Sequence, residues 1–267
     1  MSKKLFRKLS RAKKSKSFKE LDSSTLVMTI TDEFFQPARI YYDVYDQVAL
    51  QNIFLDLKCM DYDDQKNRWV WNYTDEAKKI HFKRTWSELP KEIHPLVIGS
   101  LYAPKENQMY IDVNSFERVP AVVRFFGDRI DQKIAEVTHM QLYNKISRVR
   151  DGIPDHHKLF EEILSHRPDP DAEMHALIAE AKKSGNLEEL RDQFFTEQYE
   201  KSKHKMDTIE TMKVYYDIGH EEDCLETIQN GLRMRTAVAF EHDRGNTDFT
   251  FNDFLNKAFN LTPHKGV

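Results

Sequence analysis

The stretch YYDIGHEEDCLETIQNGL, residues 215–232, is the segment from which the fold of the C-terminal part of the chain is most readily inferred. It opens with the aromatic pair Tyr215 and Tyr216 and reaches Gly219 three residues after the second of them. A charged turn follows, and apolar residues then recur at helical spacing as far as Leu232. The pattern predicts two antiparallel helices joined by a tight turn at Gly219.

A related stretch, AKKSGNLEELRDQFF, lies upstream at residues 181–195, and its Gly185 stands 34 residues before Gly219. Together the two stretches resemble the tetratricopeptide repeat, a family of helical hairpins with that period, over about residues 170–238. The resemblance implies a surface that binds other proteins and carries out no chemistry. The candidate partner-binding residues are Tyr215, Tyr216, Glu221 and Glu222.

Three positions depart from the pattern of that family. Met212 and Leu190 stand where small residues are usual, and Ser202 stands where the family has proline. Arrays of such repeats need about three stacked units for stability. A single helical hairpin would therefore need the preceding, β-rich part of the chain to cover its apolar face. An unrelated helical bundle is therefore the alternative interpretation.

The composition indicates a protein that builds a core in water. The chain has 267 residues, of which 40% are hydrophobic and 31% charged. Its apolar runs are far shorter than the ~20 residues of a membrane-spanning helix, and the apolar core of a secretory signal is missing from the N-terminus. The two cysteines, Cys59 and Cys224, lie in unlike contexts. We therefore expect no disulfide framework and a reducing, cytoplasmic location.

Charge is divided unevenly along the chain. Residues 1–20 carry nine Lys or Arg and one Glu, whereas the remaining residues carry 31 basic and 43 acidic side chains. We expect this basic tail to be disordered, because it has little apolar surface to bury. As alternatives it binds nucleic acid or makes weak peripheral contact with an anionic membrane. The tail residues concerned are Lys3, Lys4, Arg7, Lys8, Arg11, Lys13, Lys14 and Lys16.

Residues 24–150 show mainly the patterns of antiparallel strands. The segment 46–60 fits neither the helical nor the strand period, so both assignments stay open. The expected elements are strands at 25–31, 38–44, 68–73, 79–85, 96–102, 108–113 and 136–145, and a helix with Pro120 in its first turn. The strands at 68–73 and 79–85 are expected to form one hairpin, as are those at 96–102 and 108–113.

Residues 151–262 show the helical period instead. Expected helices begin after Asp155, at Pro170, after Asn186, toward Tyr216, after Gly219 and near Phe251. The fold class is therefore α+β, with a mainly antiparallel β domain followed by an α-helical domain of the helical-hairpin repeat type. The predicted division is a basic, disordered tail at 1–20, an α+β domain at 21–150 and an α-helical domain at 151–262.

The expected hairpin Arg68–Thr85 combines aromatic and basic residues. Trp69 and Trp71 alternate along its first strand, and Lys79, Lys83 and Arg84 lie on its second. Aromatic side chains beside positive charge are typical of surfaces that bind single-stranded nucleic acid. The alternative is that the tryptophans fill the core while the basic side chains face solvent.

Candidate catalytic chemistry is sparse in this sequence. His156, His157, Glu161, Glu162 and His166 form the densest group of metal-ligating residue types, but they point in different directions on one helix. Whether they bind a metal stays open, and we expect no catalytic residue, metal or cofactor. The preferred function is a non-enzymatic adaptor that binds a protein through the helical C-terminal half. Nucleic-acid binding is the alternative, and an enzyme of unknown class comes third.

Overall fold

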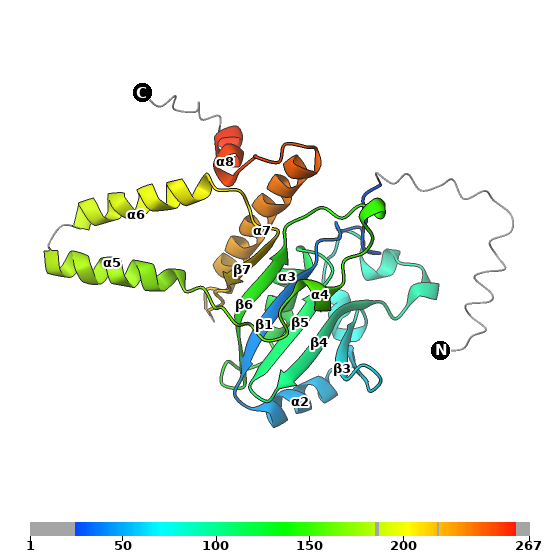
Figure 1. Ribbon diagram of the computed structural model, residues 1–267. Coiled ribbons are helices and arrows are strands. Elements are labelled where there is room, and N and C mark those ends of the chain that lie inside the picture. Colours follow the sequence, from blue (N-terminus) through cyan, green and yellow to red (C-terminus); the bar gives the residue numbers. More distant parts are fainter. Residues whose placement is uncertain (1–24, 185–186, 218, 260–267) are drawn as a thin grey trace.

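A computed structural model describes residues 25–184, 187–217 and 219–259. The chain is an α+β protein built on one seven-stranded antiparallel sheet, with the strand order β2-β3-β4-β5-β1-β6-β7. The strands are β1 Ala38–Val44, β2 Met60–Asp63, β3 Arg68–Asn72, β4 Val97–Lys105, β5 Gln108–Val113, β6 Ala135–Tyr143 and β7 Ile209–Lys213. Figure 1 shows the sheet with its helices.

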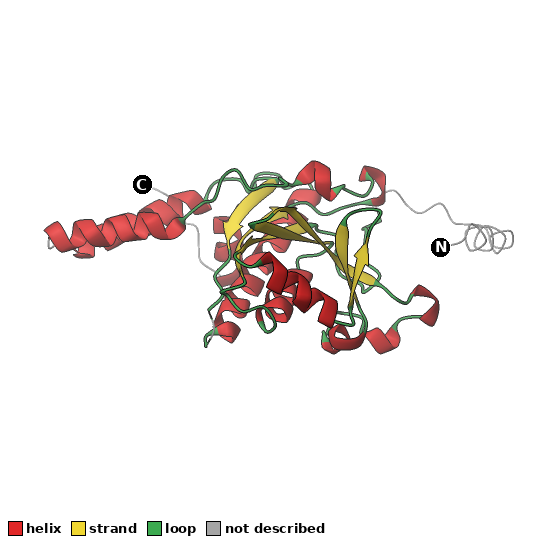
Figure 2. Cartoon of the chain, turned by 90° about the horizontal axis from the view of Figure 1, so that it is seen from below, coloured by secondary structure: helices red, strands yellow, loops and turns green. Residues whose placement is uncertain are grey.

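The described helices are α-helices and short 3-10 turns. The α-helices are α2 Gln47–Asp56, α3 Arg118–Gly127, α4 His156–Leu159, α5 Pro170–Ser184, α6 Leu187–Ser202, α7 Glu221–Asp243 and α8 Phe251–Phe259. Short 3-10 turns lie at Asp75–Lys79, Trp86–Glu88, Lys91–Ile93 and Val149–Asp151. Helices α2, α3 and α7 cover one face of the sheet, α5 and α6 project away from it as a two-helix arm, and α8 packs on α7 (Figures 1 and 2).

The main core lies between the sheet and the helices α2, α3 and α7. Phe54 of α2, Phe126 of α3 and Leu232 of α7 are buried in the same cluster as Trp71 of β3 and Ile111 of β5. The rings of Trp71 and Phe126 lie 5.3 Å apart. Burial of such apolar surface is the main force that holds the helices on the sheet.

The opposite face of the sheet is crossed by a segment with little regular structure, residues 152–169, here called the strap. Its only helix is the single turn α4, capped by the Asp155 side chain, which accepts from His157 N. The sequence predicted a longer helix that carries Phe160 and Leu164, and this is wrong. Both side chains are instead buried by the extended chain. The reason is tertiary contact: the Phe160 and Glu161 carbonyls accept from buried Arg39 of β1, and Glu161 N donates to Gln141 of β6, which hold this segment against the sheet.

Most of the elements expected in the first half are confirmed. Strand β1, the β4–β5 hairpin, helix α3 with Pro120 in its first turn and strand β6 lie where the patterns placed them. The ambiguous segment 46–60 is helix α2, and Met60 begins β2. The segment 25–31 makes only isolated bridges, at Leu26 and Met28.

The expected hairpin Arg68–Thr85 does not form. Strand β3 pairs with β2 on one side and β4 on the other, and the 3-10 turn Asp75–Lys79 follows it. The chain then continues without a strand to Thr85. Both edges of β3 are therefore occupied by other strands, which leaves no partner position for residues 79–85.

The helix expected before Gly219 is a strand. Residues Ile209–Lys213 pair with β6 as β7, so Tyr215 and Tyr216 follow a strand and not a helix. Gly219 does take a positive φ, 105°, at the turn before α7. The helix-turn-helix pair predicted around this glycine is therefore wrong in its first half. The open backbone edge of β6 offers hydrogen bonds that override the weak helical spacing of this segment.

Helices α5, α6 and α8 confirm the expected pattern, and α5 begins at Pro170 as predicted. Gly185 and Asn186, expected to separate α5 from α6, lie outside the described residues. The limits of the two expected domains stay a prediction, although β7 and α7 come from the C-terminal part and complete the sheet and its core. Among the described helices, none has both the length and the apolar character needed to cross a bilayer.

Candidate functional site

Polar side chains of the central strands gather on the face of the sheet that the strap crosses. Strand pairing places Arg39 of β1 opposite both Asp112 of β5 and Gln141 of β6. Two residues along β1, Tyr41 lies opposite Tyr110. Because alternate residues of a strand point to the same face, these side chains share one surface. The sequence therefore builds a polar layer opposite the apolar core.

Arg39 is the centre of this polar layer and is fully buried. Its Nε and Nη2 donate to the two carboxylate oxygens of Asp112 at 2.7 and 2.8 Å. Its Nη1 donates to the strap carbonyls of Phe160 (3.3 Å) and Glu161 (3.1 Å), and its guanidinium lies 3.8 Å from the ring centre of Tyr110. Burial alone would lower the pKa of Arg39, but the hydrogen bonds and charge of Asp112 outweigh it and raise this pKa. Arg39 therefore ties the strap to the sheet as a permanent cation.

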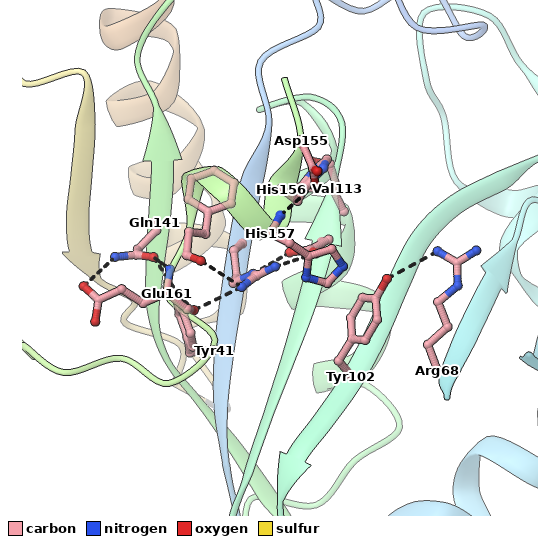
Figure 3. A network of polar contacts seen from close by, with 12 residues as sticks. Tyr41, Arg68, Tyr102, Val113, Gln141, Asp155, His156, His157 and Glu161 are labelled. Atoms are coloured by element: carbon pink, nitrogen blue, oxygen red, sulfur yellow. Dashed lines mark hydrogen bonds and ion pairs between the residues drawn. The ribbon is translucent and has the colours of Figure 1, made fainter. Parts of the chain in front are cut away.

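A second polar link holds the strap one strand further along (Figure 3). Glu161 N donates to Gln141 Oε1 at 2.9 Å, and the Tyr41 hydroxyl lies 2.7 Å from the same oxygen. The Tyr41 hydroxyl also contacts the Glu161 carbonyl. The side chain of Glu161 accepts from the Ser165 hydroxyl and amide, which lowers the pKa of this carboxyl group. These bonds fix the strap against β1 and β6.

A groove of about 530 Å³ opens beside the strap, toward β3 and β4. Arg68 of β3 enters it and donates from Nη1 to Ser100 Oγ at 2.8 Å and to the Tyr102 hydroxyl at 3.4 Å. Its Nε donates to Asp63 at 3.3 Å. The His157 ring packs edge-on against Tyr102, with 5.2 Å between the ring centres. The groove can therefore bind a polar ligand, and within it Ser100 Oγ accepts a hydrogen bond from Arg68.

The expected metal-ligating residues lie along the strap without converging. His156 contacts the carbonyl of Val113 through Nε2 at 2.9 Å, and His157 packs on Tyr102. Glu161 accepts from Ser165. Glu162 and His166 are exposed. Within the described part of the chain, no three side chains of metal-ligating type come together.

The expected partner-binding residues lie around the start of α7. Tyr215 is 45% exposed and donates to Asp171 of α5 at 3.0 Å. The half-buried ring of Tyr216 covers Gly127 at the end of α3. Glu221 lies in the first turn of α7, and the amide of Gly219 is the main cause of its lowered pKa. Glu222 pairs with Arg124. All four residues thus have a contact within the chain itself, while Tyr215 and Glu222 stay exposed, the latter with 85% of its side chain accessible.

The basic residues expected to bind nucleic acid do not form a strand. Lys83 pairs with Glu117 at 3.3 Å, and Arg84 pairs with Asp32 at 2.7 Å. Lys79 is exposed at the end of a 3-10 turn. The lysines and arginines of residues 1–20 lie outside the described residues.

The aromatic residues of β3 belong to the core. Trp71 is fully buried, and the ring of Trp69 packs 5.5 Å from Phe54 of α2. Of the two interpretations of this segment, the one that places its tryptophans in the core is therefore confirmed.

The arm formed by α5 and α6 carries exposed apolar side chains that the sequence analysis did not single out. Phe195 is 61% exposed and Tyr199 is 49% exposed on α6. Met174 and Ile178 of α5 are 43% and 40% exposed. Each pair is spaced i, i+4, so each lies on one helix face. The sequence shows this spacing, but it does not show that the two helix faces stay exposed.

Comparisons with models of protein families, with curated proteins and with solved structures give no match to this chain.

Proposed function

We propose that the chain is a non-enzymatic adaptor that binds a protein partner on its α5–α6 arm. The observation that carries the proposal is the set of four exposed apolar side chains, Met174, Ile178, Phe195 and Tyr199, on two helices that project from the sheet. Large apolar side chains grouped on a surface are typical of protein-binding sites. Aromatic residues among them contribute most to affinity when a partner covers them.

The arm has room for a further helix because its helices have few neighbours. Helix α5 packs on α6, and α6 makes a small contact with α8 (Figure 1). Two helices bury only the stripe between them, whereas an amphipathic helix is stable when its whole apolar face is covered. A partner helix that lies along the arm would cover the exposed residues.

The charge of the arm indicates which kind of partner helix would bind along it. Residues 170–202 contain eight Asp or Glu and four Lys or Arg. An amphipathic helix with Lys and Arg beside its apolar face would complement this surface, and a second acidic arm would be repelled. We therefore propose a basic amphipathic helix of another protein as the partner.

Site-specific photo-crosslinking tests this proposal. A photoreactive phenylalanine analogue at Phe195 in the full chain is expected to give a discrete adduct in a cell extract, and the same analogue at Leu55 of α2, 70% exposed, is the matched control. Excess unlabelled protein should abolish the adduct, whereas a Phe195→Asp/Tyr199→Asp competitor should be roughly 30-fold weaker, because buried aromatic residues dominate such interfaces. An adduct of equal yield at Leu55, or equal competition by the variant, would contradict the proposal.

Nucleic-acid binding through residues 1–20 stays the alternative proposal. It is supported by the nine Lys or Arg in that segment, while Lys83 and Arg84 are already paired with carboxylates. Binding of this kind weakens steeply as salt rises. A titration of labelled single-stranded RNA between 50 and about 200 mM salt should show that slope in the full chain and lose it on deletion of residues 1–20.

A further inference from the structure

We propose that the groove between β3 and the strap binds a small phosphorylated molecule, with Arg68 as the residue that holds the phosphoryl group. The site is separate from the α5–α6 arm and does not depend on the adaptor function. The site consists of the fixed guanidinium of Arg68, the hydroxyl groups of Ser100 and Tyr102 on one face of β4, and Lys66 at the rim.

Arg68 is positioned before any ligand arrives. It is 19% exposed, and its hydrogen bonds to Ser100, Tyr102 and Asp63 fix the plane of its guanidinium group. Among the described residues, none accepts a hydrogen bond from its Nη2, so the two N–H groups of that nitrogen are available. A guanidinium of fixed orientation matches the paired oxygens of a phosphate better than an ammonium does.

Most of the charged groups around the groove are paired within the chain. The carboxylate of Asp112 lines the groove but is neutralised by Arg39 through two hydrogen bonds. The Asp155 carboxylate accepts from the backbone of His157. Lys66, at the turn between β2 and β3, is exposed at the rim and has no acidic partner among the described residues. Arg68 is itself paired with Asp63 at 3.3 Å, so Lys66 brings the uncompensated positive charge to the rim and Arg68 contributes the open donor Nη2.

The dimensions fit a small molecule and not a bare ion. The groove measures about 530 Å³, within the range of roughly 300–1,000 Å³ that is usual for small-molecule sites. Val97, which is 40% exposed, and Pro154 add apolar surface beside the polar groups. The strap forms one wall, and Arg39 and Gln141 hold that wall in place. A ligand would thus contact two walls that are already formed.

Titration calorimetry and hydrogen exchange with inorganic phosphate and phenyl phosphate test the site. We expect phosphate to bind weakly and phenyl phosphate more tightly, because only the latter covers the apolar wall. Arg68→Gln should weaken both roughly tenfold or more. The matched control is Arg124→Gln, since Arg124 is an exposed, ion-paired arginine of α3 on the other face of the sheet. It should bind both ligands as the parent does.

Hydrogen exchange in the parent protein keeps the test independent of how Arg68→Gln folds. Phenyl phosphate should slow exchange in residues 97–102 and 154–157 and leave α7 unchanged. Binding that Arg68→Gln retains in full would overturn the proposal. So would protection confined to other segments, or the lack of any binding by the parent protein at millimolar ligand.

Discussion

Arg39 shows how one residue decides the path of a distant segment. Its side chain is buried, pairs with Asp112 and donates to two carbonyls of the strap. A buried charge is costly unless all its hydrogen bonds are made. The strap therefore lies where it satisfies Arg39, and not where helical periodicity alone would place it.

Replacing Arg39 with methionine should lower the free energy of unfolding by about 3–5 kcal/mol, because Asp112 is then a buried charge without its partner. The double variant Arg39→Met/Asp112→Leu should recover much of that loss, since no charge is left behind. Urea unfolding of the four proteins measures both effects. Strictly additive losses would show that the two side chains are not coupled.

His139 makes the stability of the chain depend on pH. It is 6% exposed, and burial is the main cause of its lowered pKa, with smaller contributions from the positive charges of Arg167 and Lys213. The unfolded chain binds a proton near the ordinary histidine pKa of about 6.5, more readily than the folded protein does. The stability contributed by the neutral ring is therefore present above that pH and is lost as the pH falls below it.

We expect the free energy of unfolding to decline between pH 7.5 and 5.5, with a smaller decline in His139→Gln. Glutamine keeps an N–H in place of the ring nitrogen Nε2, which lies 3.1 Å from the carbonyl of Pro168. Urea unfolding at four or five pH values gives the two slopes. Parallel curves would assign the pH dependence to other histidines.

At this scale the sequence left most of the candidate site unseen. Arg39, Tyr41 and Gln141 alternate with apolar residues, as on any solvent-facing side of a sheet. Their role depends on the strap, which begins 11 residues after Gln141 and more than 100 residues after Arg39 and Tyr41, and which has no periodicity of its own. The pattern of each strand was readable, but its contact with a distant irregular segment was not.

At the scale of elements, the local sequence pattern predicted a strand or helix correctly where its signals and its partner lie close by in the sequence. The β4–β5 hairpin and helix α3 were predicted because their signals are local. Strand β7 was missed because its partner, β6, is distant in sequence, and the apolar residues 206, 209 and 212 also fit a helix. The contact between two elements can nevertheless be tested at one position, where Tyr216 covers Gly127.

Gly127→Ala should destabilise the chain, although alanine is normally favoured over glycine in a helix by about 0.5–1 kcal/mol. A Cβ atom there would lie 2.8 Å from Cζ and 2.9 Å from the hydroxyl oxygen of Tyr216, so the ring would have to move. In a Tyr216→Ala background the same change should stabilise. A double-mutant cycle by thermal unfolding reveals the reversal, and an unchanged sign would mean that the ring moves aside freely.

At the scale of the whole molecule, the C-terminal part completes the structure of the N-terminal part. Strand β7 covers the edge of β6, and Leu225, Ile228 and Leu232 of α7 are buried in the main core. An N-terminal domain that ends at residue 150 would expose that edge and that apolar face. The division at residue 150 can therefore be tested directly.

We expect a fragment of residues 21–150 to lose cooperative unfolding and to bind a hydrophobic dye, because its core lacks the cover of α7. Thermal unfolding by circular dichroism and dye fluorescence measure these properties, with the full chain as the control. A sharp transition in the fragment, without dye binding, would support an independent domain.

The separation of β6 from β7 also bears on the order in which the chain folds. About 65 residues, which include the strap and the arm, lie between these neighbouring strands. Closing a loop of that length costs roughly 2–3 kcal/mol more entropy than closing a hairpin of a few residues. The β4–β5 hairpin can therefore pair early, whereas β7 joins the sheet only after the long segment between β6 and β7 has been ordered. Until then β6 is an open edge, and a nascent chain would be most prone to join the β6 of another copy during that interval.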